Sequence, residues 1–101
     1  MIRHVVMWKL NDPADAPYFK ARLDSCLHLT DGMLDFDVGI RAEGLEANVD
    51  VMLVSQFTDA AALAAYQNHP HHQAVSAELG RLRQTRHVLD VALATPPAAK
   101  R

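Results

Sequence analysis

The chain has 101 residues, of which 50% are hydrophobic and 22% are charged, and its formal net charge is -2. This length fits one domain with one core, and the composition is ordinary for a globular protein. The sequence predicts no signal peptide, no membrane span and no basic surface for nucleic acid. The single cysteine, Cys26, leaves no internal disulfide and no Cys/His zinc motif. We therefore expect a cytoplasmic protein without a nucleic-acid or membrane partner.

The first third of the chain reads as a strand, a helix and a second strand. Side chains alternate over Ile2–Leu10, which predicts a strand with His4, Val6 and Trp8 on one face. A helix with Phe19 on its apolar stripe should follow and end at Asp31-Gly32. Alternation resumes over residues 34–41, where the apolar face would comprise Leu34, Phe36, Val38 and Ile40.

The stretch from 49 to 75 reads as a strand, a cap and a broken helix. Alternation places Leu53 and Ser55 on one face of the strand, and Thr58-Asp59 suits the start of a helix. Pro70 cannot continue that helix but suits the first turn of a second piece. Helical spacing then turns Tyr66, His72 and Val75 toward the sheet. Buried polar groups need partners, so this polar pair marks a candidate site.

A last strand is expected over residues 86–93, with Asp90 and Val88 on one face. The element order is then β-α-β-β-α-β, which is the ferredoxin-like arrangement of the α+β class. It consists of an antiparallel four-stranded sheet with two helices on one face. We assign the domain to residues 1–95 and expect a disordered tail over 96–101.

Two helices can cover only one side of this sheet. If His4, Leu53 and Asp90 face the helices, the other side carries Val5, Met7, Met52, Val54, Leu89, Val91 and Leu93. An apolar face of this size predicts a homodimer packed through the open sheet face. The alternative is a monomer that tolerates the patch.

Four segments together resemble the stress-responsive A/B barrel, or Dabb, family: IRHVVMWKL, DGMLDFDVG, DVMLVSQFTDAAALAAYQNHPHHQAV and VLDV. The resemblance covers nearly the whole chain, and the AYQ-x-HP-x-H piece is its most specific part. It implies a dimeric α/β barrel. The family includes plant stress proteins, bacterial members without an assigned activity, and olivetolic acid cyclase-like proteins that close a polyketide by an aldol condensation.

Carried across by motif, the resemblance implies a catalytic set of His4, His72, Tyr66 and Asp90, in which Asp90 supports His72. Around it we expect a small apolar cavity lined by Val6, Trp8, Phe19, Leu53, Ser55 and Val75. Trp8 stands where a smaller aliphatic side chain lines the cavity of the cyclase, and a pocket tyrosine is replaced near Arg22. Both differences bear on the substrate.

An aldol or isomerisation step needs a base near neutral pKa and a donor for the enolate oxygen. His72 suits the first role, and Tyr66 or His4 suits the second. The alternative is a buried polar network with a purely structural role. We predict no cofactor and no metal, because the neighbouring histidines 69, 71 and 72 diverge at a helix start and lack a supporting carboxylate.

Two functions remain open, so whether the protein is an enzyme is not decided by the sequence. One is a cyclase or isomerase that acts on a small keto or polyketide-like compound. The other is a non-catalytic stress-response or small-ligand-binding dimer. A cavity of about 300 Å³ or more beside His72 would favour the enzyme. A cavity filled by Trp8 and Leu53 would favour the second function.

Overall fold

The computed structural model describes residues 1–94. The predicted domain end at residue 95 and the predicted disordered tail over 96–101 lie outside the described residues. The elements in chain order are β1 (Ile2–Leu10), η1 (Pro13–Asp15), α1 (Ala16–Asp24), β2 (Met33–Ile40), β3 (Val51–Phe57), α2 (Ala60–Asn68), α3 (Pro70–Leu79) and β4 (Arg83–Ala92).

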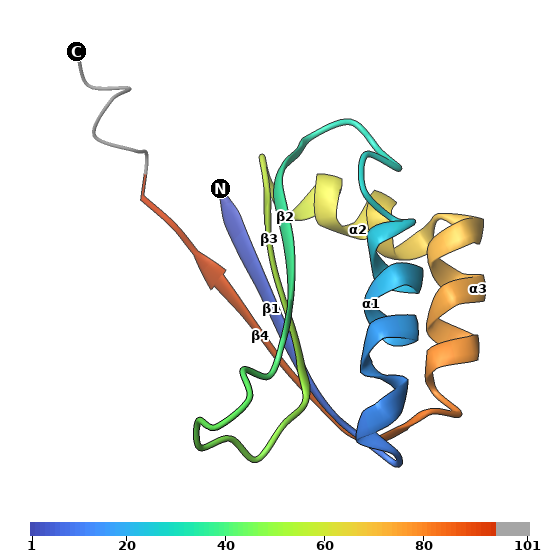
Figure 1. The fold of residues 1–101 in the computed structure, drawn as a ribbon. Helices are drawn as coiled ribbons and strands as arrows, with labels where there is room; N and C mark the ends of the chain where they lie inside the picture. Colours follow the sequence, from blue (N-terminus) through green and yellow to red (C-terminus); the bar gives the residue numbers. More distant parts are fainter. Residues whose placement is uncertain (95–101) are drawn as a thin grey trace.

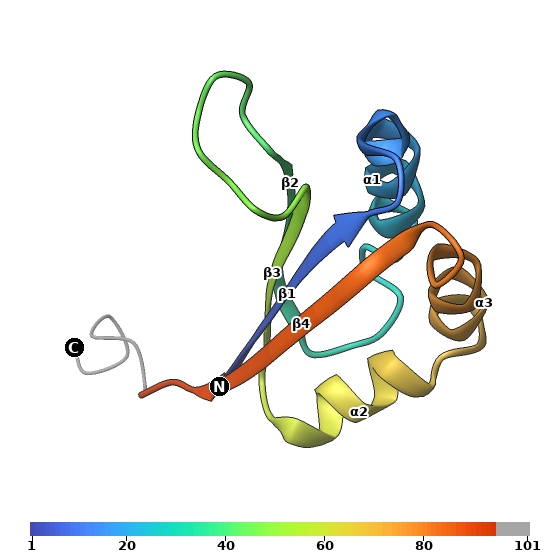
Figure 2. The same ribbon diagram turned by 90° about the horizontal axis from the view of Figure 1, so that it is seen from below.

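The four strands form one antiparallel sheet in the order β2-β3-β1-β4, with β1 between β3 and β4. Figure 1 shows α1, α2 and α3 on the same side of this sheet, and Figure 2 shows the same layering from below. The element order and this layering confirm the predicted ferredoxin-like fold.

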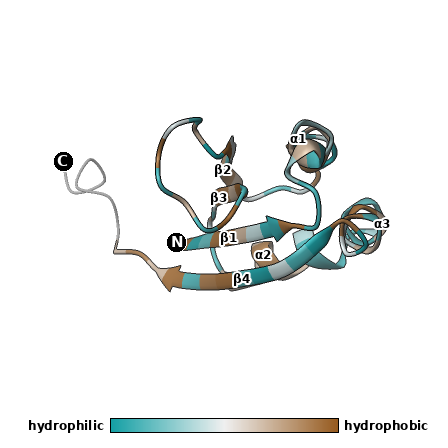
Figure 3. Cartoon of the chain, turned by 60° about the horizontal axis from the view of Figure 1, so that its bottom comes forward, coloured by the Kyte–Doolittle hydropathy of each residue, from teal (hydrophilic) through white to brown (hydrophobic). Residues whose placement is uncertain are grey.

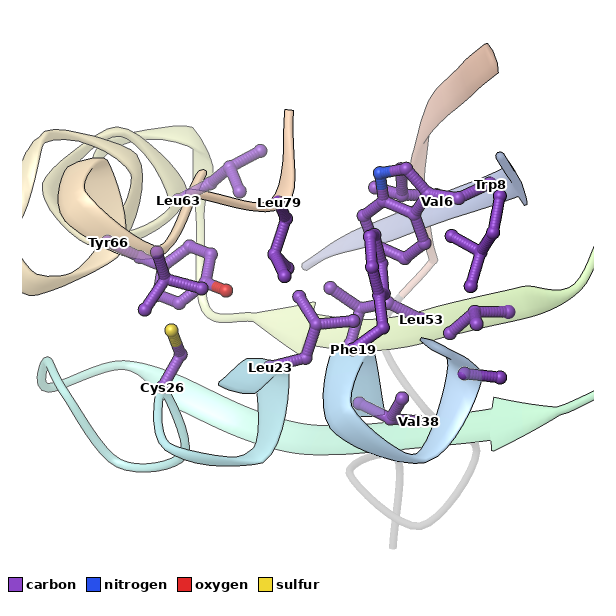
Figure 4. Packing of buried hydrophobic residues seen from close by; sticks show 14 of the residues in the cluster. Val6, Trp8, Phe19, Leu23, Cys26, Val38, Leu53, Leu63, Tyr66 and Leu79 are labelled. Atoms are coloured by element: carbon purple, nitrogen blue, oxygen red, sulfur yellow. The ribbon is translucent and has the colours of Figure 1, made fainter. Parts of the chain in front are cut away.

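The core lies between the sheet and the helices. The inward face of β3 carries Val51, Leu53, Ser55 and Phe57, all buried, as the period-2 pattern predicts. Trp8 of β1 packs edge-on against Phe19 of α1, with ring centroids 5.2 Å apart (Figure 4). Aromatic packing of this kind fixes α1 against the centre of the sheet.

The first helix ends earlier than its sequence pattern predicts. α1 ends at Asp24, not at Asp31-Gly32, and the Ser25 hydroxyl donates to the carbonyl of Arg22. Serine competes with the helix for such backbone groups, and His28 then adopts a left-handed conformation with φ +62°. Cys26 remains buried in the turns that follow.

The broken helix at Pro70 is confirmed. Asp59 accepts a hydrogen bond from the Ala62 N–H and begins α2. His69 is extended, with φ −63° and ψ 133°, and its Nδ1 accepts from the His71 N–H at 3.0 Å. The side chain of His69 therefore caps the N-terminus of α3, and α3 runs in a different direction from α2.

The second face of the sheet carries exposed apolar side chains within the described chain. Met7 and Met52 are cross-strand partners there, and Leu89 and Val91 of β4 are also exposed. Figure 3 shows the apolar segments near the end of β4. Three side chains depart from the predicted pattern: a bulge between Met33 and Asp35 leaves Leu34 exposed, and Ile40 at the end of β2 and Val88 on edge strand β4 are exposed as well.

Candidate functional site

His4 forms a pair with Asp90 across two neighbouring strands. The antiparallel register of β1 and β4 sets the two residues directly opposite each other, and His4 Nδ1 lies 2.5 Å from Asp90 Oδ1. His4 is 2% exposed, whereas the Asp90 side chain is 43% exposed. Because a carboxylate accepts, His4 donates from Nδ1 and its Nε2 is the free ring nitrogen. The predicted support of His72 by Asp90 is wrong, since the register gives the carboxylate to His4.

His72 lies in the first turn of α3 and is half-buried. Its Nδ1 lies 3.1 Å from the carbonyl oxygen of Gln67, which holds the ring so that Nδ1 donates and Nε2 is free. Burial lowers the pKa of His72 below its ordinary value of 6.5, and the charges of His4, Arg86 and His69 lower it further, against the hydrogen bond to Gln67. The ring is therefore neutral at pH 7 and can accept a proton.

Tyr66 faces inward as predicted, but its hydroxyl does not reach the two histidines as a donor. Its ring packs 4.5 Å from that of His72 and 5.2 Å from that of Phe57. Within residues 1–94 the buried hydroxyl has no hydrogen-bond partner, and Figure 4 shows it pointing into the space between Leu23, Cys26 and Leu79. Burial raises the pKa of Tyr66 well above its ordinary range. Tyr66 thus packs against the base without lining the space in front of it.

Both histidines line one small cavity of about 40 Å³, which we call the histidine cavity. Its floor is formed by buried residues of β1, and its mouth reaches the surface at Ser76 and Arg86. The lining comprises His4, Val6, Trp8, Leu23, His72, Val75, Ser76, Leu79, Arg83 and Arg86. The structure thus brings together five of the ten predicted site residues: His4, His72, Val6, Trp8 and Val75.

The other five predicted residues do not line the histidine cavity. Asp90 contacts His4 and Tyr66 packs against His72, but neither residue reaches the cavity itself. Phe19, Leu53 and Ser55 are buried under the middle of the sheet, and the Ser55 hydroxyl donates to the His4 carbonyl at 3.2 Å. Phe19 belongs to α1, and Leu53 and Ser55 belong to β3, which lies on the far side of β1 from β4, whereas the cavity lies over the β1–β4 edge.

Sequence reasoning missed five lining residues: Leu23, Ser76, Leu79, Arg83 and Arg86. Ser76 follows His72 by four residues, so helical spacing could have found it. Arg83 and Arg86 lie three apart on one strand, and strict alternation would place them on opposite faces. The register shifts between Lys9 and Leu10, and this bulge in β4 turns both arginines to the cavity side.

The volume bears on the choice between the two predicted functions. At about 40 Å³ the histidine cavity is far smaller than the roughly 300 Å³ typical of sites for drug-sized ligands. Since one water needs about 10–15 Å³ of such space, the cavity holds a group of a few heavy atoms. A larger hollow of about 390 Å³ lies between the 41–50 loop and the start of α1, and neither histidine lines it.

The neighbouring histidines 69 and 71 are held by other partners. His69 caps α3, and His71 Nε2 lies 2.8 Å from the Ser25 hydroxyl on the turn after α1. No group of three His, Cys, Asp or Glu side chains within residues 1–94 could hold a metal ion. Across the same residues, no helix is long and apolar enough to cross a membrane.

The fold and the site define an α+β protein of the ferredoxin-like class, with a small polar cavity between its last helix and the edge of its sheet. Residues 2–93 match the family model described as the Stress Responsive A/B Barrel Domain, or Dabb. The chain therefore belongs to the Dabb family, which confirms the resemblance seen in its motifs.

Solved structures show the same fold. A dimeric ferredoxin-like protein of unknown function from Thermobifida fusca has a TM-score of 0.81 and 23% identity, over 91% of this chain and 90% of that one. A Dabb family protein from Mesorhizobium loti has a TM-score of 0.76 and 20% identity, over 93% and 97%. A dimeric ferredoxin-like protein of unknown function from Jannaschia sp. has a TM-score of 0.77 and 25% identity, over 91% and 98%. No curated protein matches the sequence significantly.

Proposed function

We propose that this Dabb-family protein is a non-catalytic, stress-response type homodimer that binds a small ligand in the histidine cavity. The observation that carries the proposal is the convergence of His4 and His72 on one cavity of about 40 Å³. Each ring has one nitrogen held by a fixed partner, Asp90 or the Gln67 carbonyl, and one nitrogen free. Two oriented polar groups among apolar walls are the usual composition of a small-molecule site.

A fragment screen by ¹⁵N-resolved NMR tests this proposal. We expect small polar fragments to shift the indole N–H signal of Trp8, which lines the histidine cavity and is the one tryptophan of the chain. Ser76→Phe should block the mouth and remove these shifts. Ala77→Phe, on the next exposed position of α3 and outside the lining, should retain them. Fragments that bind Ser76→Phe and wild type equally would place the ligand elsewhere.

The homodimer part of the proposal concerns the open face of the sheet. Met7, Met52, Leu89 and Val91 are exposed there, and two neighbours of the same fold are described as dimeric. A second copy of the chain would remove these apolar side chains from water. A cytoplasmic location is a further part of the proposal, supported by the buried free thiol of Cys26.

A second candidate is proton transfer on a small keto compound, as in a cyclase or isomerase. It is favoured by the His4–Asp90 pair and by the neutral state of His72. In this mechanism His72 Nε2 removes a proton next to a carbonyl, and a His4 ring protonated on both nitrogens donates from Nε2 to the enolate oxygen while its Nδ1–H stays on Asp90. The volume restricts the reacting part to a few heavy atoms, which argues against a whole polyketide chain inside the cavity.

Exchange of the C3 protons of 2-oxobutyrate in D₂O tests this candidate. Catalysed exchange should disappear in His72→Gln and persist in His71→Gln, because His71 contacts Ser25 outside the cavity. Exchange at the uncatalysed rate with the wild type would leave ligand binding as the function.

A further inference from the structure

The bulge in β4 gives the histidine cavity two cationic side chains on one side. Arg86 is the register partner of Trp8, and Arg83 is the register partner of Leu10. Trp8 and Leu10 both face the helices, so both arginines do as well. Since Lys9 pairs with Thr85, the intervening Gln84 is the extra residue of the bulge. A strand without the bulge would turn one of the two arginines to the open face.

The ionisable side chains that line the histidine cavity are all basic. Its lining includes two arginines and two histidines and no acidic residue, although the whole chain has a net charge of -2. The carboxylate of Asp90, opposite His4 on β4, is already bound to His4. Within the described part of the chain, neither Arg83 nor Arg86 forms an ion pair or a side-chain hydrogen bond. By contrast, Arg22 of α1 pairs with Glu78 of α3.

From this arrangement we infer that the ligand of the histidine cavity is a small organic carboxylate, bound through Arg83 and Arg86. This inference rests on the proposed function, since it names the class of ligand for the same cavity. A guanidinium presents a planar fork of donors that matches a carboxylate, and Arg83 is half-buried, so water competes less for it.

The remaining lining explains why the anion is organic. Val6, Trp8, Leu23, Val75 and Leu79 supply apolar walls that a short hydrocarbon chain can contact. An inorganic oxoanion would leave these walls facing its polar surface. The free Nε2 atoms of His4 and His72 can accept hydrogen bonds from a second polar group of the ligand, such as a hydroxyl.

Matched probes that differ only in charge test the inference. Acetate and butyrate are titrated beside acetamide and butyramide at constant ionic strength, with the Trp8 indole N–H signal as the readout. We expect butyrate to bind at least about tenfold more tightly than butyramide, a difference of about 1.4 kcal/mol. Arg83→Gln and Arg86→Gln should each remove most of this preference. Arg81→Gln, a neighbouring exposed arginine outside the cavity lining, should preserve it.

The outcomes separate this inference from the proposed function. If butyramide binds as tightly as butyrate, the cavity binds ligands but does not select carboxylates, and only the inference fails. A preference that survives both Gln variants also overturns it. If inorganic phosphate binds as tightly as butyrate, the ligand is an oxoanion and the organic class is wrong. If no probe shifts the Trp8 signal, the proposed function fails together with the inference.

Discussion

Met7→Lys on the open face of the sheet should separate the proposed dimer. Met7 and Met52 are cross-strand partners, and they are 38% and 37% exposed. Burying a whole methionine side chain stabilises by about 1.5–3 kcal/mol, so the exposed part of Met7 is worth roughly 0.6–1.1 kcal/mol. Twofold symmetry doubles this to roughly 1.2–2.2 kcal/mol per dimer. An unpaired ammonium adds several kcal/mol for each lysine buried, so the Kd should rise more than about a hundredfold.

Sedimentation equilibrium at micromolar concentration measures this change. The wild type should sediment as a dimer and Met7→Lys as a folded monomer, with circular dichroism as the check on folding. Leu45→Lys is the matched control, because Leu45 is an exposed apolar residue of the loop between β2 and β3. A monomeric wild type, or a Met7→Lys protein that dimerises with wild-type affinity, would refute the assignment of this face.

Three further predictions concern the cavity and the fold. Asp90→Ala should lower the free energy of unfolding in urea by about 1 kcal/mol, because His4 loses its hydrogen-bond acceptor. This is the low end of the range for a lost acceptor, since the side chain of Asp90 is 43% exposed and water reaches the site. Asp90→Asn should lower the free energy of unfolding by less. Equal losses would contradict this account of the pair. The pKa of His72 in the folded protein lies below 6.5, so as the pH falls the imidazole is protonated first in the unfolded chain. The contribution of His72 to stability should therefore be full above pH 6.5 and decrease as the pH drops toward the folded pKa. An NMR titration of the His72 ring should give a midpoint below 6.5. A midpoint at or above 6.5 would be the opposite result. Gly32→Ala should destabilise the protein more than Gly44→Ala. Both glycines have a left-handed backbone, with φ +85° and +82°, which costs about 1–2 kcal/mol for alanine. Only at Gly32 would the added Cβ also lie 2.8 Å from atoms of other side chains. Similar thermal unfolding of the two variants would argue against that close contact.

Side-chain periodicity was sufficient to predict the faces of the central elements. Val51 to Phe57 alternate without interruption, and the inward side chains are buried as predicted. Pro70 cannot continue a helix, and the structure divides α2 from α3 at that residue. These features depend on local backbone geometry, so they can be predicted from the sequence alone.

The partner of Asp90 could not be predicted from local pattern. Periodicity assigns a side chain to a face of a strand, but the pairing of His4 with Asp90 depends on the register of strands 86 residues apart. The bulge that brings Arg83 to the cavity has the same origin, since it follows from how β4 pairs with Lys9 and Leu10. Tyr66 illustrates the same limit in a helix, where spacing predicted an inward ring but not the direction of its hydroxyl.

A crystal soaked with butyrate tests the central claim most directly, because difference density shows where a ligand lies. We predict density in the space between His4, His72 and Arg86, with the carboxylate on the arginine side. Density confined to other parts of the surface, with the Trp8 side chain filling the histidine cavity, would contradict the assignment of this cavity as the ligand site.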